Sequence, residues 1–222
     1  MTHGRRDTPP RGGQWVPEAL PSPAGPVRVV FADPALVIVD KPSGLPSQPA
    51  GIGPSLDAIV RAAFPDAALV HRLDQPASGL VVFPRGRHAG AVTDALRAHT
   101  VRRAYQAVLV GAVDADDLRW TWPVDGRPAA TRVRVVGRRQ GLVAASVELE
   151  TGRTHQIRQH AARAGAPIAG DRRYGAEAGA WCERLALHAA SLTLRHPITG
   201  ELLTFGAPLP PPLDALWAEA GG

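Results

Sequence analysis

Alternating hydrophobic and polar residues mark several short stretches of the chain as strands. In the stretch 143–150, for example, Val143, Ala145 and Val147 fall on one face and the residues between them on the other. Runs rich in valine, leucine and isoleucine that are bounded by Gly, Pro or Asp give the same signal elsewhere. The predicted strands cover residues 27–31, 36–39, 80–83, 105–110, 118–124, 131–136, 143–150, 185–194 and 202–205.

Apolar residues spaced three or four apart predict four short helices. The first spans 55–64, where Leu56 and Val60 share a face and Ser55 is placed to cap the N-terminus. The others are expected at 88–99, at 154–164 with Thr154 as the N-cap, and at the C-terminal end of the chain, stopping near Ala220.

The predicted strands are connected mostly by turns, such as Asp33-Pro34 and Asp125-Gly126. Short turns join antiparallel neighbours, whereas a doubly wound parallel sheet needs a crossover helix between strands. We therefore expect an α+β fold with a mainly antiparallel mixed sheet and short flanking helices. One domain is expected over residues 27–222. Residues 1–26 form a basic leader whose Pro- and Gly-rich sequence has no helical or strand period and is typical of disorder.

The chain is basic, and nearly all of its positive charge is arginine. Lysine and arginine number 25 against 20 acidic residues, the isoelectric point is near 10.5, and Lys41 is the only lysine. The guanidinium group pairs with phosphate and stacks on bases. This composition therefore favours a polyanionic partner.

Cys182 is the only cysteine, which excludes an internal disulfide and a cysteine-based zinc site and is typical of a reducing cytosol. No apolar run approaches the roughly 18–20 residues that span a membrane. The N-terminus also lacks the apolar core of a signal peptide. These features predict a cytoplasmic protein without a membrane segment.

The most informative stretch is H-R-L-D-Q-P-A-S-G-L, residues 71–80, which holds a carboxylate at a constrained turn. Asp74 precedes Pro76, which fixes one backbone angle, and Gly79, which adopts conformations that other residues resist. A carboxylate held beside a buried strand suits a nucleophile. Taken alone, however, an aspartate before a turn is more often structural, because its side chain bonds to the nearby backbone.

A second stretch, T-G-R-T-H-Q-I-R at residues 151–158, could meet that carboxylate. His155 and Arg158 lie three residues apart and share a helix face. Arg158 is placed to pair with a carboxylate across a cleft and lower its pKa. The alternative is a solvated basic helix that packs against a sheet.

In a third stretch, residues 101–105, Arg102 and Arg103 run into Tyr105 on a predicted strand. Basic residues beside an aromatic ring suit phosphate contact combined with base stacking. Taken alone, this stretch is more simply a half-buried core tyrosine beside solvated charges.

The sequence offers no pattern for a metal or a nucleotide cofactor. His155 and His160 are five residues apart, which is the wrong spacing for two ligands on one helix face. The phosphate-binding loop of nucleotide triphosphatases, the dinucleotide motif G-x-G-x-x-G and the hydrolase elbow G-x-S-x-G are all absent. We therefore expect neither a metal nor a cofactor.

Together and in this order, these stretches resemble the RluA-like family of pseudouridine synthases. The resemblance runs along nearly the whole chain after the leader. Its most specific motifs are H-R-L-D, residues 71–74, and T-G-R-T-H-Q-I-R, which begins about 80 residues later. Weaker matches are K-P-S-G at 41–44, R-A-Y-Q-A at 103–107, P-A-A-T at 128–131, G-D-R-R-Y-G at 170–175, L-H-A at 187–189 and H-P-I-T-G at 196–200.

The resemblance implies the pseudouridine synthase catalytic fold over residues 27–222 and an isomerase that acts on RNA. Such an enzyme breaks the N1–C1′ bond of a uridine and rejoins the uracil through C5, without metal or cofactor. Asp74 is implied as the essential carboxylate, and attack on C1′, attack on the base and removal of the 2′ proton stay open as its route. Arg158 would pair with Asp74, and Tyr105 would stack on the target base and help the proton leave C5.

The resemblance also implies an RNA-binding set. Arg72 would fill the gap left when the uridine is flipped out of its stem-loop, and Ile157 would pack against the uracil. The arginines expected to contact phosphates are Arg102, Arg103, Arg153 and Arg163. The chain has no room for the S4-like RNA-binding domain of longer members, so it resembles the short ones, which act on stem-loops of transfer or ribosomal RNA. A monomer is expected.

One position departs from the family pattern, because Ala77 stands where threonine is usual. Loss of that hydroxyl is expected to loosen the turn or shift the choice of substrate. Two other functions stay open. An RNA-binding protein with weak catalysis on the same fold is disfavoured by the retention of Asp74. A metal-dependent nuclease is disfavoured because clustered carboxylates and ligand-spaced histidines are missing from the sequence.

Overall fold

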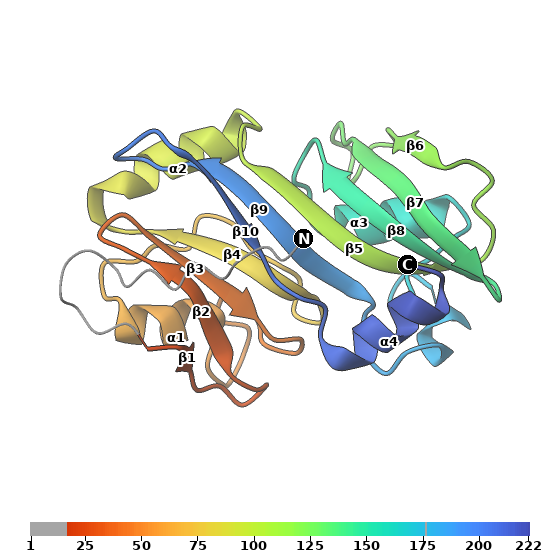
Figure 1. Cartoon of the computed structure of the whole chain (residues 1–222), viewed down its shortest axis with the longest axis horizontal. Coiled ribbons are helices and arrows are strands. Elements are labelled where there is room, and N and C mark those ends of the chain that lie inside the picture. The colour runs from red at the N-terminus through yellow and green to blue at the C-terminus, as the bar shows by residue number, and fades with distance from the viewer. Residues whose placement is uncertain (1–16, 176) are drawn as a thin grey trace, which may run out of the picture.

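The computed structural model describes residues 17–175 and 177–222 (Figure 1). Its strands are β1 (Ala19–Leu20), β2 (Val27–Ala32), β3 (Leu36–Lys41), β4 (Ser78–Pro84), β5 (Arg102–Val110), β6 (Asp117–Trp120), β7 (Thr131–Arg139), β8 (Leu142–Leu149), β9 (Leu187–Arg195) and β10 (Leu202–Gly206). Its α-helices are α1 (Leu56–Ala63), α2 (Ala89–Arg97), α3 (Gln156–Arg163) and α4 (Pro211–Glu219), with 3-10 turns at Gly86–His88 and Glu177–Ala180. The predicted N-cap of α1 is confirmed, since Ser55 Oγ accepts a bond from the N–H of Ala58.

The described strands form one sheet in the order β1-β2-β3-β4-β9-β5-β8-β7-β6, with β10 paired to β9 outside this path. The pairings are antiparallel except for that of β4 with β9, which is parallel. Figure 1 shows the sheet as one long twisted layer, with α4 and β10 on the near side and α3 behind β8. The predicted α+β fold with a mainly antiparallel mixed sheet is confirmed.

Side-chain alternation buries both faces of the central strands. Along β3, Val37 and Val39 belong to one apolar cluster, whereas Leu36 and Ile38 belong to the other. Every residue of β4 is buried as well. A strand packed on both faces is a rigid base for the loop that precedes it, residues 71–77.

The start of α3 differs from the prediction that Thr154 is its N-cap. The helix begins at Gln156, and its N-cap residue is His155, which has a left-handed backbone (φ 55°, ψ 25°) and makes no side-chain capping bond. The hydroxyl of Thr154 instead accepts a hydrogen bond from Arg72 Nη2 at 2.8 Å. Strand β6 is also shorter than predicted and ends at Trp120, where the chain leaves β7 for a separate turn.

Part of the predicted leader belongs to the folded domain. Residues 17–26 include β1, which pairs with β2, and Leu20 is buried in the core. The described fold therefore begins before the expected boundary at residue 27. The rest of the predicted leader, residues 1–16, lies outside the described residues.

Gly79, near the start of β4, packs directly against the backbone of β9. Its φ is +113°, and a Cβ there would lie 2.4 Å from the carbonyl oxygen of Ala189. We expect Gly79→Ala to lower the free energy of unfolding by about 3 kcal/mol, because the positive φ and the overlap with backbone both oppose a methyl group. Urea unfolding followed by circular dichroism measures this change.

Gly90→Ala, in α2, is the matched control for this prediction. A Cβ at Gly90 meets nothing within 4 Å, and alanine inside a helix is favoured over glycine by about 0.5–1 kcal/mol. The control should therefore unfold at a slightly higher urea concentration than the wild type. Equal unfolding midpoints for the two variants would show that the contact between Gly79 and β9 does not constrain the fold.

Candidate active site

The loop that carries Asp74 is held through its backbone. The N–H of Ala77 donates to the carbonyl of Asp74 at 3.1 Å and closes the turn. From the neighbouring loop at 42–45, Ser43 Oγ donates to the carbonyl of Pro76 at 2.6 Å. Because backbone groups close the turn, its closure does not need the hydroxyl that Ala77 lacks.

Lys41 lies fully buried beneath this loop. Its Nζ is within 2.7–3.2 Å of four carbonyl oxygens, those of Pro42, Leu45, Gln75 and Ala77. Burial lowers the pKa of Lys41 to about 7, and the charge of Arg184 adds to this effect. The only lysine of the chain thus ties the loop at 42–45 to the loop that carries Asp74.

The carboxylate of Asp74 meets Arg158 from α3. Arg158 Nη1 donates to Asp74 Oδ2 at 3.2 Å, and the two side chains are 6% and 19% exposed. The Nε and Nη2 groups of Arg158 both donate to Asp171 at 2.8 Å. Burial opposes the ionisation of Asp171, but the hydrogen bonds and charge of Arg158 outweigh this and lower its pKa. Asp171 therefore fixes the guanidinium plane that faces Asp74.

A cavity of about 610 Å³ surrounds this ion pair. Of the nine residues that the sequence analysis named as catalytic or RNA-binding, seven line it, which are Arg72, Asp74, Arg103, Tyr105, Arg153, Ile157 and Arg158. Burial raises the pKa of Tyr105, and the charge of Asp74 adds to this while that of Arg103 opposes it. At neutral pH the Tyr105 hydroxyl therefore keeps its proton and is able to donate a hydrogen bond to a ligand.

Two other arginines that were expected to contact phosphates do not line this cavity. Arg102 and Arg103 are consecutive in β5, so their side chains point to opposite faces of the sheet. Arg102 lines a second cavity of about 660 Å³, between α2 and the β9–β10 hairpin. Arg163 lies over the ring of Trp122, with its Cζ 5.3 Å from the ring centre.

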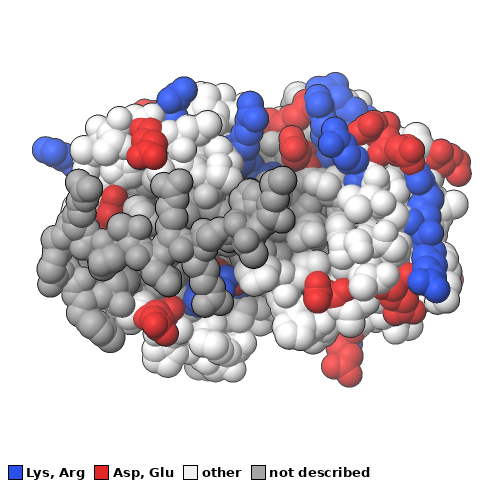
Figure 2. All heavy atoms as spheres, viewed as in Figure 1, with Lys and Arg blue, Asp and Glu red and all other residues white. Residues whose placement is uncertain are grey.

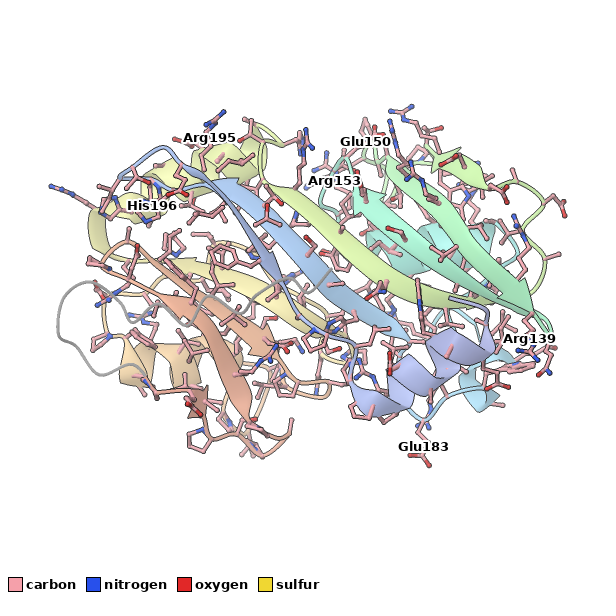
Figure 3. All side chains as sticks on the ribbon, viewed as in Figure 1. Arg139, Glu150, Arg153, Glu183, Arg195 and His196 are labelled. Carbon is pink, nitrogen blue, oxygen red and sulfur yellow. The ribbon has the colours of Figure 1, made fainter. Side chains whose placement is uncertain are left out.

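The arginines that line the cavity around Asp74 differ in how they are held. Arg72 is bonded to Thr154, as described above, and Arg153 Nε donates to the carbonyl of Pro128 at 3.1 Å. Figure 3 places Arg153 near the upper edge of the molecule, between α2 and the β6–β8 end of the sheet. The Nε of Arg103 is buried without a hydrogen-bond partner among the described residues. This side of the cavity therefore has an N–H donor that the described residues leave unpaired.

Arginines at the β6–β8 end of the sheet are balanced by nearby carboxylates. Arg134 pairs with Asp117 at 3.3 Å, and Arg138 pairs with Asp116 at 2.7 Å. Figure 2 shows acidic and basic side chains interspersed over this end of the molecule. By contrast, among the described residues that line the cavity, Asp74 is the only acidic one, and five are arginines, namely Arg72, Arg97, Arg103, Arg153 and Arg158.

Three residues of this site had no role assigned in the sequence analysis. Lys41 and Asp171 both belong to motifs that matched the family pattern, K-P-S-G and G-D-R-R-Y-G, so a signal was present. His155 had been placed on one helix face with Arg158, and its Nε2 lies 3.7 Å from Asp74 Oδ1. The backbone conformation that brings it there has no signal in the sequence.

Within residues 17–175 and 177–222, no three side chains of His, Cys, Asp or Glu gather in a way that could hold a metal ion. None of the described helices has the length and apolar character needed to cross a membrane. Cys182 is a free thiol.

The family model for RNA pseudouridylate synthases matches residues 35–163, which is more than half of the chain. The chain belongs to this family. RNA pseudouridylate synthases are isomerases that convert uridine to pseudouridine in RNA. The predicted family and enzyme class are therefore confirmed.

Curated relatives agree with this assignment, and a solved structure shares the fold. Ribosomal large subunit pseudouridine synthase D of Xanthomonas campestris is 37% identical over 227 residues, which cover 86% of this chain and 68% of the relative. The protein of the same name from Nitrosomonas europaea is 35% identical, covering 86% of this chain and 64% of the relative. The chain thus spans about two thirds of their length. Human RNA Pseudouridylate Synthase Domain Containing 1 shares the fold, with a TM-score of 0.74 at 24% identity over 89% of this chain and 90% of that chain.

Proposed function

We propose that this pseudouridine synthase isomerises a specific uridine of ribosomal or transfer RNA, with Asp74 as the essential carboxylate. The observation that carries the proposal is the ion pair of Asp74 with Arg158 in the cavity that Tyr105 also lines. The names of the two bacterial relatives favour RNA of the large ribosomal subunit as the first substrate to test.

The proposed reaction balances without a cofactor. It breaks the N1–C1′ bond, forms a C5–C1′ bond, and exchanges the proton on C5 for one on N1. Arg158 orients the carboxylate of Asp74 for attack on C1′, attack on the base or removal of the 2′ proton. We also propose that the protein acts as a monomer without a metal, since one chain supplies every group in these roles, and that it acts in the cytoplasm.

The target uridine must leave its stem-loop to reach Asp74. Flipping a base costs about a few kcal/mol, and less in a loop than in a duplex. We assign Arg72 to fill the gap in the RNA and Ile157 to pack against the uracil. We assign Arg103 and Arg153 to phosphate contacts, which make the affinity fall as salt rises.

Tyr105→Phe should lower kcat by about 10²–10³-fold with little change in KM, because phenylalanine keeps the stacking ring and loses the hydroxyl that helps move protons. Release of tritium from RNA labelled at C5 of uridine measures turnover, since that hydrogen leaves during the reaction. Unchanged kcat would leave Tyr105 as a stacking platform only.

Two experiments test the proposed function itself. Carbodiimide mapping of pseudouridines in cellular RNA, with and without this gene, should show one or a few sites that disappear and return on complementation. The purified protein should modify RNA containing such a site in EDTA, and should elute as a monomer. RNA that is bound and left unmodified would instead support a non-catalytic binding protein, and cleavage that EDTA abolishes would support a metal-dependent nuclease.

A further inference from the structure

His155 is the residue at which the chain turns into α3, and its backbone conformation is unusual. Its φ of 55° and ψ of 25° lie in the left-handed region, which few residues other than glycine adopt. Non-glycine residues in this region cluster at functional sites, where the surrounding structure holds them. The side chain of His155 lines the cavity around Asp74.

The two ring nitrogens of His155 face different partners. Nδ1 lies 2.9 Å from the hydroxyl oxygen of Tyr174, and Nε2 lies 3.7 Å from Oδ1 of Asp74. A lone pair on Nε2 would repel the carboxylate, so the hydrogen belongs on Nε2, and Nδ1 accepts the bond from the Tyr174 hydroxyl. Burial lowers the pKa of His155 against the opposing charge of Asp74, which keeps the ring neutral at neutral pH.

Tyr174 is itself held in place by charged neighbours. Its N–H donates to Asp171 Oδ1 at 3.1 Å. The guanidinium groups of Arg158 and Arg173 lie over its ring, with their Cζ atoms 5.1 and 5.4 Å from the ring centre. Asp171 therefore contacts both Arg158 and Tyr174. Arg158 contacts Asp74 directly, and Tyr174 contacts the histidine that lies beside Asp74.

We propose that His155 is a positioning residue for Asp74. Its Nε2–H holds Oδ1 while Arg158 holds Oδ2, and the Tyr174 hydroxyl keeps the imidazole in the tautomer that allows this. The inference rests on the proposed role of Asp74 as the essential carboxylate.

This arrangement gives the carboxylate one defined orientation. A single donor leaves it free to turn about the Cβ–Cγ bond, whereas a donor on each oxygen fixes its plane for reaction with the flipped uridine. The distance of 3.7 Å between Nε2 and Oδ1 shortens to a hydrogen bond when substrate fills the cavity, as catalytic contacts in empty sites commonly do.

His155→Asn tests this role, because asparagine tolerates the left-handed backbone and is too short to reach Asp74. We expect kcat to fall by about 10–100-fold, with KM for RNA changed less than about twofold. His155→Gln places an amide N–H near the position of Nε2 and should restore most of kcat. Recovery by a side chain that does not titrate separates positioning from proton transfer.

Tyr174→Phe tests the second part of the arrangement. Alone it should lower kcat by about 10-fold. In the His155→Asn protein it should have no further effect, because Tyr174 acts through His155. His88→Asn, at a histidine that lines neither cavity, is the control and should leave turnover unchanged.

Tritium release at saturating and limiting RNA, with thermal melts of each variant, decides between the outcomes. If His155→Gln is as inactive as His155→Asn, the imidazole transfers protons and the positioning role is wrong. A loss confined to KM would make His155 an RNA contact, and independent losses in the double variant would remove Tyr174 from the arrangement.

If His155→Asn is unfolded, the comparison of His155→Gln with Tyr174→Phe carries the test. An inactive wild type refutes the proposed function, whereas an active wild type with an unaffected His155→Asn refutes this inference alone.

Discussion

Asp74→Asn is expected to abolish pseudouridine formation while the protein stays folded and binds RNA. The amide has the shape of the carboxylate, but it can neither attack C1′ or the base nor take a proton. The buried guanidinium of Arg158 keeps its two bonds to Asp171, so the substitution leaves no unpaired charge. We expect kcat to fall by at least about 10⁴-fold, as for other essential nucleophiles and bases, with a melting temperature near that of the wild type.

The tritium-release assay and an RNA-binding titration, run on the same preparation, measure both halves of this prediction. Asp33→Asn is the matched control. Asp33 is also a carboxylate at a turn before a buried strand, where its Oδ1 accepts bonds from the N–H groups of Ala35 and Leu36. An asparagine oxygen can accept the same two bonds, so the substitution changes only the contact of Oδ2 with Nε2 of His196, which is 2.8 Å away. Asp33 does not line the cavity around Asp74. A kcat of Asp74→Asn above about 10⁻⁴ of the wild-type value would remove Asp74 from its assigned role.

Asp171→Asn should impair stability and catalysis together. Asp171 is 1% exposed and takes two bonds from Arg158, and removing one partner of a buried ion pair costs about 3–5 kcal/mol. For a domain of this size, that loss lowers the melting temperature by about 10 °C. Arg158 would also lose the partner that fixes its plane against Asp74, and we expect kcat to fall by about 100-fold at temperatures where the variant is folded.

Thermal melts and kcat measured well below the melting temperature test the two effects separately. Glu150→Gln is the comparison, because Glu150 also pairs with an arginine, Arg119, at 2.7 Å, but at the surface. Surface ion pairs contribute little to stability, so this variant should melt close to the wild type. If Asp171→Asn melts no lower than Glu150→Gln, the buried pair does not hold the site together.

Much of the local structure could be predicted because it depends on residues close together in the sequence. The cap at Ser55 and the strands on either side of Asp33-Pro34 follow from spacing within about one element. The parallel contact of β4 with β9 could not be predicted in this way. It places Ser78 Oγ 2.8 Å from Nδ1 of His188, and the two residues are 110 positions apart, a distance over which no hydrophobic period carries information.

The site likewise combines features that the sequence predicts with features that it does not. Asp74, Tyr105 and Arg158 could be named as one set because each lies in a recognisable motif, and the structure brings all three to one cavity. The shift of the α3 N-cap from Thr154 to His155 had no such signal. Threonine is a common N-cap, and nothing in the neighbouring residues predicts a left-handed backbone conformation at His155. The imidazole of His155 contacts Tyr174 and Asp74, which come from other parts of the chain.

The position of Lys41 has a consequence for how the protein can be modified. Since the only lysine is fully buried, the folded surface offers no side-chain amine, and every lysine or arginine charge there is a guanidinium. Enzymes and reagents that acylate amines would reach Lys41 only after the loop carrying Asp74 had come away from it. Phosphates that approach the surface meet forked donors whose charge does not titrate in the physiological range. Lysine acetylation therefore cannot reduce the attraction of the folded surface for RNA, and a label on Lys41 would report that the loop carrying Asp74 had opened.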